Sequence, residues 1–355
     1  IIDNAQTIKQ DETQEANRTK WGTEIATFSN VSGENERVLN TIADDYGTSY
    51  YYRGNVIDNY VSFAGFTWRI VRINGDGSVR LVLNSLNNET AYNNETNDNA
   101  YVGYMYGLAG STTDENRCLI LIDNEVVNKV DEYTTKEMCE ANNGTWTKTA
   151  YDATHSNIKN STIKEYNETW YKTNIEDKGY SKYVADTLFC NDKRVTITKG
   201  YGQINSWYVS TDRMWWPEKI LAPILRCAPN ATNDYSRFTV NKNLLSNSNM
   251  TNGKLTYPVG LITMDEVVFA GSYKDGVNNT KYYLYNYHQG WYTMTPYALL
   301  NNSVGIAAIV GRVSSAGSTN TSDVISKYRS RIVINLKKDT KVTGTGTSTD
   351  MYKIV

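Results

Sequence analysis

Residues 60–83 restrict the fold more than any other part of the chain. Residues 60–65 and 68–73 alternate along the chain and are rich in β-branched and aromatic side chains, and an Asn-Gly-Asp-Gly run at 74–77 separates them from the apolar residues 79–83. Successive side chains of a strand point to opposite faces, and Asn-Gly and Asp-Gly accept the positive φ angles of tight turns. The segment therefore predicts a β-hairpin.

Other segments carry local signals of the same kind. Thr263 and Glu266 have capping-box spacing, which predicts a short helix over residues 267–270, stopped by Gly271. Apolar residues near helical spacing predict a helix over 163–175. Apolar runs predict strands at 118–122, 255–262, 282–287, 291–297, 304–310 and 331–336, with a polar loop over 84–99. The sequence predicts an α+β fold, rich in β-strands, with few short helices and an N-terminal helical or extended stalk.

The cysteines point to an oxidising compartment. The chain has four cysteines and two histidines, which are Cys118, Cys139, Cys190, Cys227, His155 and His288. No pair has CxxC spacing, so zinc-finger and thioredoxin sites are not expected, and two histidines supply a metal site poorly. We expect disulfides, no metal and no cofactor. Three connectivities are open, and sequential pairing, which closes loops of moderate length, is favoured.

Charge and hydropathy exclude two classes of partner. The 36 Lys and Arg nearly balance the 38 Asp and Glu, so no nucleic-acid partner is expected. No run of about 18 apolar residues occurs, and membrane attachment would need a segment absent from this chain. The opening, residues 1–5, lacks Met and resembles the stretch after the hydrophobic helix of type IV pilin-like proteins of Gram-positive bacteria. That resemblance implies a pilin-like stem.

Several motifs together resemble an uncharacterised family of exported proteins from Gram-positive, gut-type bacteria. They are Asp-Asp-Tyr-Gly-Thr-Ser-Tyr-Tyr-Tyr-Arg-Gly at 44–54, residues 68–77, Tyr-Pro-Val-Gly-Leu-Ile-Thr at 257–263, residues 265–267, and the 331–336 strand with its Gly-Thr-Gly-Thr tail. The order of the last third is similar to the C-type-lectin-like architecture shared with formylglycine-generating enzymes. The resemblance implies a stalk over 1–43 and a C-type-lectin-like domain over 44–355, with a polar, disulfide-bearing insertion near 84–150.

The residues give little support to catalysis. The chain lacks the calcium motif of lectins, the cysteine pair of formylglycine-generating enzymes, and the fingerprints of hydrolases, zinc peptidases and nucleotide-binding proteins. Asp44 with Asp45, and Asp265 with Glu266, are carboxylate pairs, but adjacent residues rarely converge on one substrate atom. We assign them structural roles, interpret 74–77 as a turn rather than a calcium loop, and place His288 in a loop or packing role. No enzyme activity is expected.

The segment 278–302 is the candidate binding face. It contains seven aromatic residues among small polar ones: Tyr282, Tyr283, Tyr285, Tyr287, Trp291, Tyr292 and Tyr297. Rigid amphipathic rings make adaptable contact surfaces, and they also stack on sugars. The alternative is that these rings cover a β-sheet.

The sequence thus favours two functions, and leaves as a third an enzyme in which Asp, Glu or Tyr side chains converge in a cleft. The first is a structural or adhesion protein displayed outside the bacterial cell, of which a pilin-like subunit that self-assembles into a filament is one form. The second is a monomeric module that binds a host or microbial glycan or protein through the 278–302 face.

Overall fold

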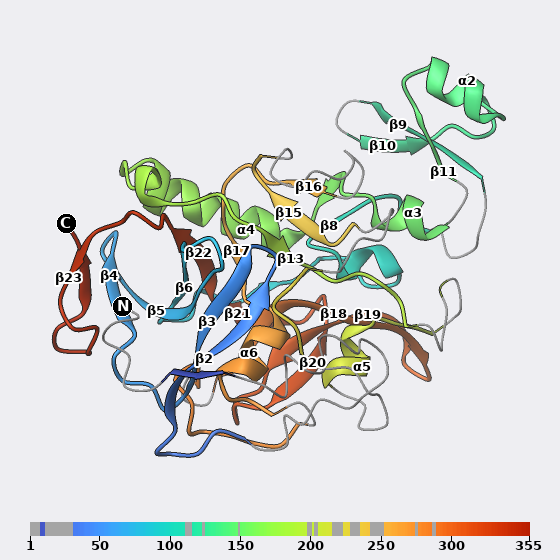
Figure 1. Ribbon diagram of the computed structural model, residues 1–355. Helices are drawn as coiled ribbons and strands as arrows, with labels where there is room; N and C mark the ends of the chain where they lie inside the picture. Colours follow the sequence, from blue (N-terminus) through green and yellow to red (C-terminus); the bar gives the residue numbers. More distant parts are fainter. Residues whose placement is uncertain are drawn as a thin grey trace.

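The computed structural model describes residues 8–10, 31–110, 116–122, 125–147, 150–196, 201, 205–214, 223–227, 235–241, 252–273, 276–285 and 289–355. Over these residues the protein has an α+β fold dominated by β-strands, as predicted (Figure 1). The strands are β1 (Ile8–Gln10), β2 (Arg37–Asp44), β3 (Gly47–Gly54), β4 (Tyr60–Phe63), β5 (Phe66–Ile73), β6 (Val79–Leu83), β7 (Thr90–Ala91), β8 (Met105–Tyr106), β9 (Arg117–Ile122), β10 (Glu125–Asn128), β11 (Thr145–Thr147), β12 (Lys159–Asn160), β13 (Phe189–Cys190), β14 (Ser206–Trp207), β15 (Arg237–Thr239), β16 (Asn252–Lys254), β17 (Gly260–Leu261), β18 (Trp291–Asn302), β19 (Gly305–Val313), β20 (Thr319–Asp323), β21 (Lys327–Ser330), β22 (Ile332–Leu336), β23 (Val342–Thr343) and β24 (Tyr352–Ile354). The helices are α2 (Lys136–Ala141), α3 (Ala150–His155), α4 (Thr162–Tyr171), α5 (Ser210–Met214), α6 (Met264–Ala270), the 3-10 helices η2 (Asn99–Val102) and η4 (Ser181–Tyr183), and the π-helix η3 (Lys172–Glu176).

The predicted hairpin is the centre of the larger sheet. Strands β5 and β6 pair antiparallel, and Asn74 accepts the Gly77 N–H across the turn at 2.8 Å, with Gly77 at φ +86°. The sheet runs β1-β2-β3-β5-β4-β24-β23, and β6 joins β5 to β22, which also pairs β17. All six residues from 68 to 73 are buried, including Arg69 and Arg72. Both faces of β5 are therefore covered, although the sequence pattern suits a strand with one wet face.

A second sheet runs β20-β19-β18-β21-β7, with β14 paired to β18. The strands predicted at 291–297, 304–310 and 331–336 are confirmed as β18, β19 and β22. The β18–β19 register shifts on both sides of Pro296, as expected for a residue without an N–H for the ladder. The strand predicted at 282–287 is wrong over 282–285, which forms a turn in which Tyr285 donates its N–H to the Tyr282 carbonyl. Residues 286–288 lie outside the described residues. Only β17 remains of the strand predicted at 255–262.

The two predicted helices are present. In α6 the Thr263 hydroxyl accepts the Glu266 N–H at 3.1 Å and the Glu266 carboxylate accepts the Thr263 N–H at 2.9 Å, which confirms the capping box. Helix α6 lies against β3 (Figure 1), where the Phe269 and Tyr51 rings meet at 4.7 Å. Helix α4, capped by Ser161, covers β5 through Trp170 and continues into η3.

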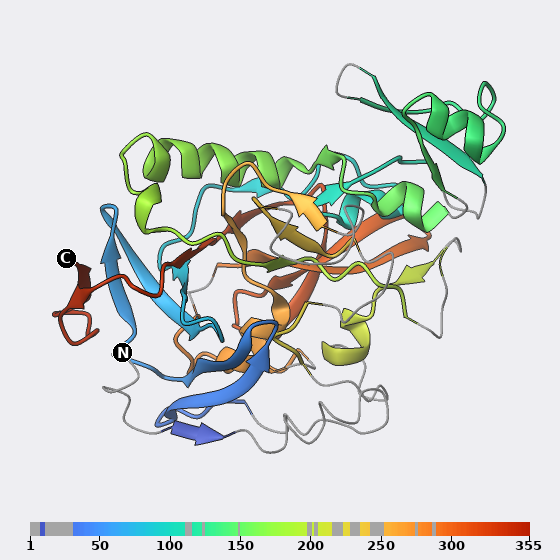
Figure 2. The ribbon, with the colours of Figure 1, turned by 45° about the horizontal axis from the view of Figure 1, so that its top comes forward.

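Both disulfides follow the favoured pairing, Cys118–Cys139 and Cys190–Cys227. The first closes a small unit of β10-β9-β11 and α2, residues 116–122 and 125–147, which we call the projecting unit. Figures 1 and 2 show it standing away from both sheets. It joins the body where Leu119 packs with Ala153 and Leu108.

The predicted domain boundaries need correction at two points. The insertion expected over 84–150 begins later, because β7, η2 and β8 belong to the body and β7 pairs with β21. The stalk expected over 1–43 does not include residues 8–10 or 37–43, because β1 pairs with β2 and β2 pairs with β3 along its whole length in the larger sheet. Residues 1–7 and 11–30 lie outside the described residues.

Gly271 should be needed at the end of α6. Its φ is +129°, and a Cβ there would approach Ser32 and lie 2.8 Å from the Tyr282 Cβ. We expect Gly271→Ala to lower the free energy of unfolding by about 2–3 kcal/mol, measured by urea denaturation. Gly65→Ala is the matched control, since Gly65 also has positive φ but open space around it, and should cost about 1 kcal/mol. Equal losses would contradict the close approach.

The Cys118–Cys139 bond should stabilise the projecting unit alone. A Cys118→Ser/Cys139→Ser variant should be cleaved faster by protease within residues 116–147, because an exposed unit this small loses about 3 kcal/mol of loop-closure stabilisation. The Tm of the body should stay unchanged, whereas Cys190→Ser/Cys227→Ser should lower it. Equal falls in the Tm of the body would show that the unit is not separately stabilised.

Candidate functional site

The largest group of buried charged side chains in the described residues is a set of ion pairs beneath the hairpin. Arg72 donates from Nε to Glu266 Oε1 at 3.1 Å and from Nη1 to Asp44 Oδ2 at 2.6 Å. Arg80, on the next strand, donates from Nη2 to Glu266 Oε2 at 3.3 Å, and its Nε lies 2.5 Å from Oε1. These four side chains are at most 9% exposed.

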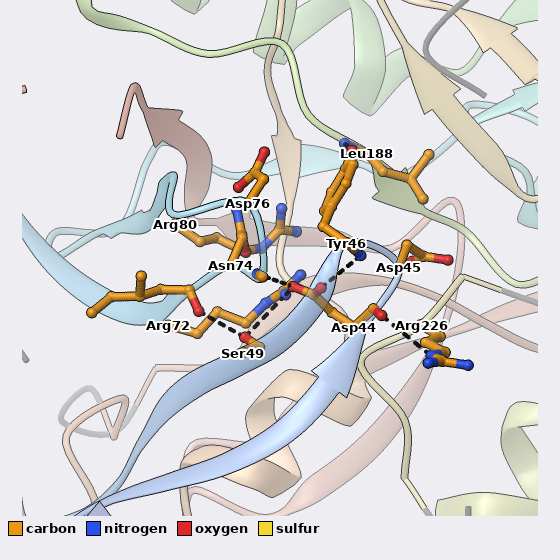
Figure 3. Close-up of polar contacts among 12 residues, drawn as sticks. Asp44, Asp45, Tyr46, Ser49, Arg72, Asn74, Asp76, Arg80, Leu188 and Arg226 are labelled. Carbon is orange, nitrogen blue, oxygen red and sulfur yellow. Dashed lines mark hydrogen bonds and ion pairs between the residues drawn. The ribbon is translucent and has the colours of Figure 1, made fainter. Parts of the chain in front are cut away.

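Local structure fixes both carboxylates. Glu266 is the third residue of α6, so the capping box that starts the helix also holds its carboxylate toward β5 and β6. Asp44 ends β2, where it accepts the N–H groups of Tyr46 at 2.8 Å and of Gly75, in the hairpin turn, at 3.0 Å. Figure 3 shows Asp44 between the Arg72 side chain and Arg226, whose Nε donates to the Asp44 carbonyl at 3.2 Å.

A second set of ion pairs lies beside the first. Arg213 on α5 donates from Nε to Asp265 Oδ1 at 2.7 Å and from Nη2 to Asp265 Oδ2 at 3.0 Å, a two-point contact. Its Nη1 donates to Asp192 Oδ2 at 2.8 Å, and Asp192 also pairs with Arg194 at 2.9 Å. Because Asp265 and Glu266 are adjacent in α6, the first turn of that helix joins the two sets.

We call Asp44, Arg72, Arg80, Asp192, Arg213, Asp265 and Glu266 the buried ion-pair cluster. It borders a cavity of about 20 Å³ that is also lined by Leu188, Cys190, Ile224, Leu225, Arg226, Thr263 and Thr295. A cavity of this size holds about one water-sized sphere.

Two carboxylates of the cluster, Glu266 and Asp192, have pKa values shifted away from neutral pH. Burial opposes the charge on Glu266, but attraction to Arg80 and Arg72 outweighs it, and the pKa of Glu266 lies below its usual value. Burial likewise opposes the charge on Asp192, but attraction to Arg194 and Arg213 outweighs it and brings the pKa of Asp192 well below its usual range. A general acid or base works best with a pKa near the operating pH. These carboxylates therefore suit structural ion pairs better than proton transfer.

The described histidine is also structural. His155 is fully buried, and burial together with the charge of Lys193 lowers its pKa well below the usual value. Its Nε2 lies 3.0 Å from the Tyr208 hydroxyl and its Nδ1 lies 3.1 Å from the Tyr151 carbonyl. The imidazole is buried and held neutral between two hydrogen-bond partners. His288 lies outside the described residues.

One group of possible metal ligands is ruled out by its bonding. Asp45, Cys190 and Cys227 bring ligand atoms within 4.8 Å of one another. The two sulfurs are joined to each other as a disulfide, and a metal would need them as thiolates. Asp45 instead accepts the Cys227 N–H at 2.8 Å and fixes this segment to the β2–β3 turn.

The predicted binding face needs correction. The structure buries Tyr282, Tyr283, Trp291 and Tyr292 at 0–6% exposure. The Tyr282 hydroxyl donates to the Gly317 carbonyl at 2.9 Å and the Tyr292 hydroxyl to the Ser326 carbonyl at 2.6 Å. All four rings lie in the core, and two of them have their hydroxyls bonded to backbone, so they cannot form a contact surface.

The other three predicted ring positions differ among themselves. Tyr285 is half buried against the core, and Tyr297 is half buried with its ring 5.2 Å from that of Trp207. Tyr287 lies outside the described residues. The structure therefore brings the rings together mainly as packing, and does not gather them on one exposed face.

Sequence reasoning missed the buried arginines. Arg69, Arg72 and Arg80 occupy strand positions among apolar residues, Arg331 lies between β21 and β22, and each is at most 7% exposed. Arg331 has no carboxylate partner among the described residues; it donates to two carbonyls, lies 5.3 Å from the Trp291 ring centre, and burial lowers its pKa to about 10. An arginine repeated inside strongly apolar strands is the signal that could have indicated an interior ionic network.

Comparison of the chain with protein-family models, curated proteins and solved structures finds no match. Among the described residues, no helix is both long and apolar enough to cross a membrane.

Glu266 should make the protein acid-sensitive. Because the folded-state pKa of Glu266 is lowered, its contribution is complete above the unfolded value of about 4.3 and is lost as the pH falls through the folded value. We expect Glu266→Gln to lower the free energy of unfolding by about 3–5 kcal/mol at pH 7, because buried Arg80 loses its one counter-charge and Arg72 keeps only Asp44. The difference from the wild type should shrink below about pH 4.

Urea denaturation followed by tryptophan fluorescence between pH 7 and pH 3 tests this. Glu89→Gln is the matched control, because Glu89 is exposed and 3.8 Å from Arg329, and should cost less than about 1 kcal/mol at every pH. A Glu266→Gln penalty that stays constant down to pH 3 would show that the charge is not the cause.

Proposed function

We propose that this protein is a structural or adhesion protein displayed outside the bacterial cell, and that its projecting unit contacts a polypeptide partner. The observation that carries the proposal is the surface of that unit. Leu121 is 60% exposed, Ile122 41% and Met138 45%, on a small element that stands away from the body. Leu121 and Ile122 are successive residues of β9 and so point to opposite faces of the unit's sheet. Large apolar side chains left exposed on a protruding unit are a feature of protein contact sites.

The rest of the described residues favour display over catalysis. The charged groups of the buried ion-pair cluster are paired with one another, and the cavity beside them has room for about one water-sized sphere. Two disulfides in a 355-residue chain also favour an oxidising compartment outside the cytoplasm. A stapled body that carries a separately stapled contact unit fits that setting.

The partner is proposed to be a polypeptide rather than a glycan. None of the large apolar side chains exposed by the described residues is aromatic, whereas sugar binding relies on ring faces. Strand β10 lies at the edge of the unit's sheet and pairs only with β9 among the described residues. Such an edge can accept a strand from another chain, and the neighbouring aliphatic side chains would cover it. A second copy of this chain as the partner would be the filament case.

The first test is localisation. Electron microscopy of the native cell surface with an antibody against this chain, compared with cells lacking the gene, should show labelling that disappears in the deletion. Labelled filaments would support the subunit form, and diffuse wall labelling would support the adhesion form. Label confined to the cytoplasm would sink the proposal.

The second test is a surface substitution. Leu121→Ser with Ile122→Ser should weaken contact with the partner at least tenfold, measured as self-association of the purified protein in sedimentation or as attachment of the producing cells. The Tm should stay unchanged, because both side chains are exposed. Ile325→Ser is the matched control, an isoleucine 46% exposed on the body, and should change neither. If the double variant matches the wild type in both assays, the projecting unit is not the contact element.

A further inference from the structure

The carboxylate of Asp45 lies beside the Cys190–Cys227 disulfide. One Asp45 oxygen and the two sulfurs all lie within 4.8 Å of one another. Asp45 Oδ2 accepts the Cys227 N–H at 2.8 Å, which holds the carboxylate in this place, and Figure 3 shows the side chain pointing away from Arg72. A negative charge is therefore fixed next to the disulfide that joins β13 to the segment 223–227.

This carboxylate is not engaged by a cation. Among the described residues Asp45 makes no ion pair, unlike the carboxylates of the buried ion-pair cluster. Two arginines accompany the cysteines: Arg226 precedes Cys227 in the chain, and Arg237 lies opposite Cys190 in the β13–β15 ladder. Their charges would attract an anion to the disulfide, and the charge of Asp45 opposes that attraction.

Reduction of a disulfide by a thiol proceeds through anions. The thiolate of the reductant attacks one sulfur, the S–S bond breaks, and the other cysteine leaves as a thiolate, which gives a mixed disulfide. Cys190 is half-buried whereas Cys227 is 1% exposed, so the attack falls on Cys190 and Cys227 is the leaving group. A second thiolate then releases Cys190, and the reductant is oxidised to its own disulfide. The first step brings one negative charge toward Asp45 and develops another beside it.

We propose that Asp45 protects the Cys190–Cys227 disulfide against reduction by small thiols. Its charge repels the incoming thiolate and raises the free energy of the Cys227 thiolate that must leave. The bond so protected keeps the segment 223–227 in place, where Ile224 donates its N–H to the Asp265 carboxylate of the buried ion-pair cluster at 3.0 Å. This inference is independent of the projecting unit and of the proposed display function.

The first test removes the charge and keeps the hydrogen-bond acceptor. In the folded, full-length protein, mercaptoethanol should reduce the Cys190–Cys227 bond about tenfold faster in Asp45→Asn than in the wild type, at a pH well above the usual range of a carboxyl group. The Cys118–Cys139 bond of the same molecule is the internal control, and its rate should not change. Trapping of released thiols with iodoacetamide, followed by peptide mass spectrometry, gives the rate at each bond. Equal rates at Cys190–Cys227 in the two proteins would overturn the proposal.

The second test separates charge from local loosening by varying the charge of the reductant. The acceleration by Asp45→Asn should be smallest with cysteamine, which carries a positive charge, and largest with mercaptoacetate, which carries a second negative charge. High salt should shrink the difference, because Asp45 is exposed. A substitution that only loosened the β2–β3 turn would accelerate all three thiols equally, and that result would overturn the proposal.

The wild type supplies an independent check if Asp45→Asn does not fold. The ratio of the cysteamine rate to the mercaptoacetate rate should be higher at the Cys190–Cys227 bond than for the uncharged disulfide of mercaptoethanol, because only the protein bond has a carboxylate beside it. Equal ratios would show that Asp45 does not act on the attacking thiolate.

Discussion

The contact of one carboxylate, Glu266, with two buried arginines is the interaction on which the rest of the body depends. It ties the start of α6 to β5 through Arg72 and to β6 through Arg80, and Arg72 extends the link to Asp44 at the end of β2. Removing one partner of such a group strands the others without compensation in a medium of low dielectric constant. The attraction within these pairs adds little net stability, because burying the charges costs free energy. The pairs nevertheless fix how α6 packs against the β5–β6 hairpin.

The elements that could be predicted from sequence are those whose signals are local. The Asn-Gly-Asp-Gly turn, the capping box of Thr263 and Glu266, and the spacing of the four cysteines each describe neighbours within a few dozen residues. The ionic cluster could not be found this way, because Arg72 and Glu266 are 194 residues apart. An alternating strand shows which side chains share a face, but it cannot show whether that face meets water or α6. The C-type-lectin-like architecture stays a prediction.

The tyrosine-rich segment 278–302 also shows that sequence alone does not decide whether a residue is buried or exposed. Its composition is that of a contact surface, and a tyrosine is equally suited to a core that can supply an acceptor for its hydroxyl. Tyr282 and Tyr292 find such acceptors in backbone carbonyls far along the chain, at Gly317 and Ser326. Composition therefore indicates which residues can serve two roles, and only the tertiary arrangement decides between them.

The body and the projecting unit are stabilised in different ways because they differ in size. The body buries a large apolar core and can enclose seven ionised side chains because the surrounding structure satisfies most of them. The projecting unit packs Leu119 against the body and also contacts α3 through β11, and a unit of that size cannot bury enough apolar area to be stable alone. Its disulfide restricts the unfolded unit instead, so apolar side chains such as Leu121 need not serve as core and are left on the surface for contact.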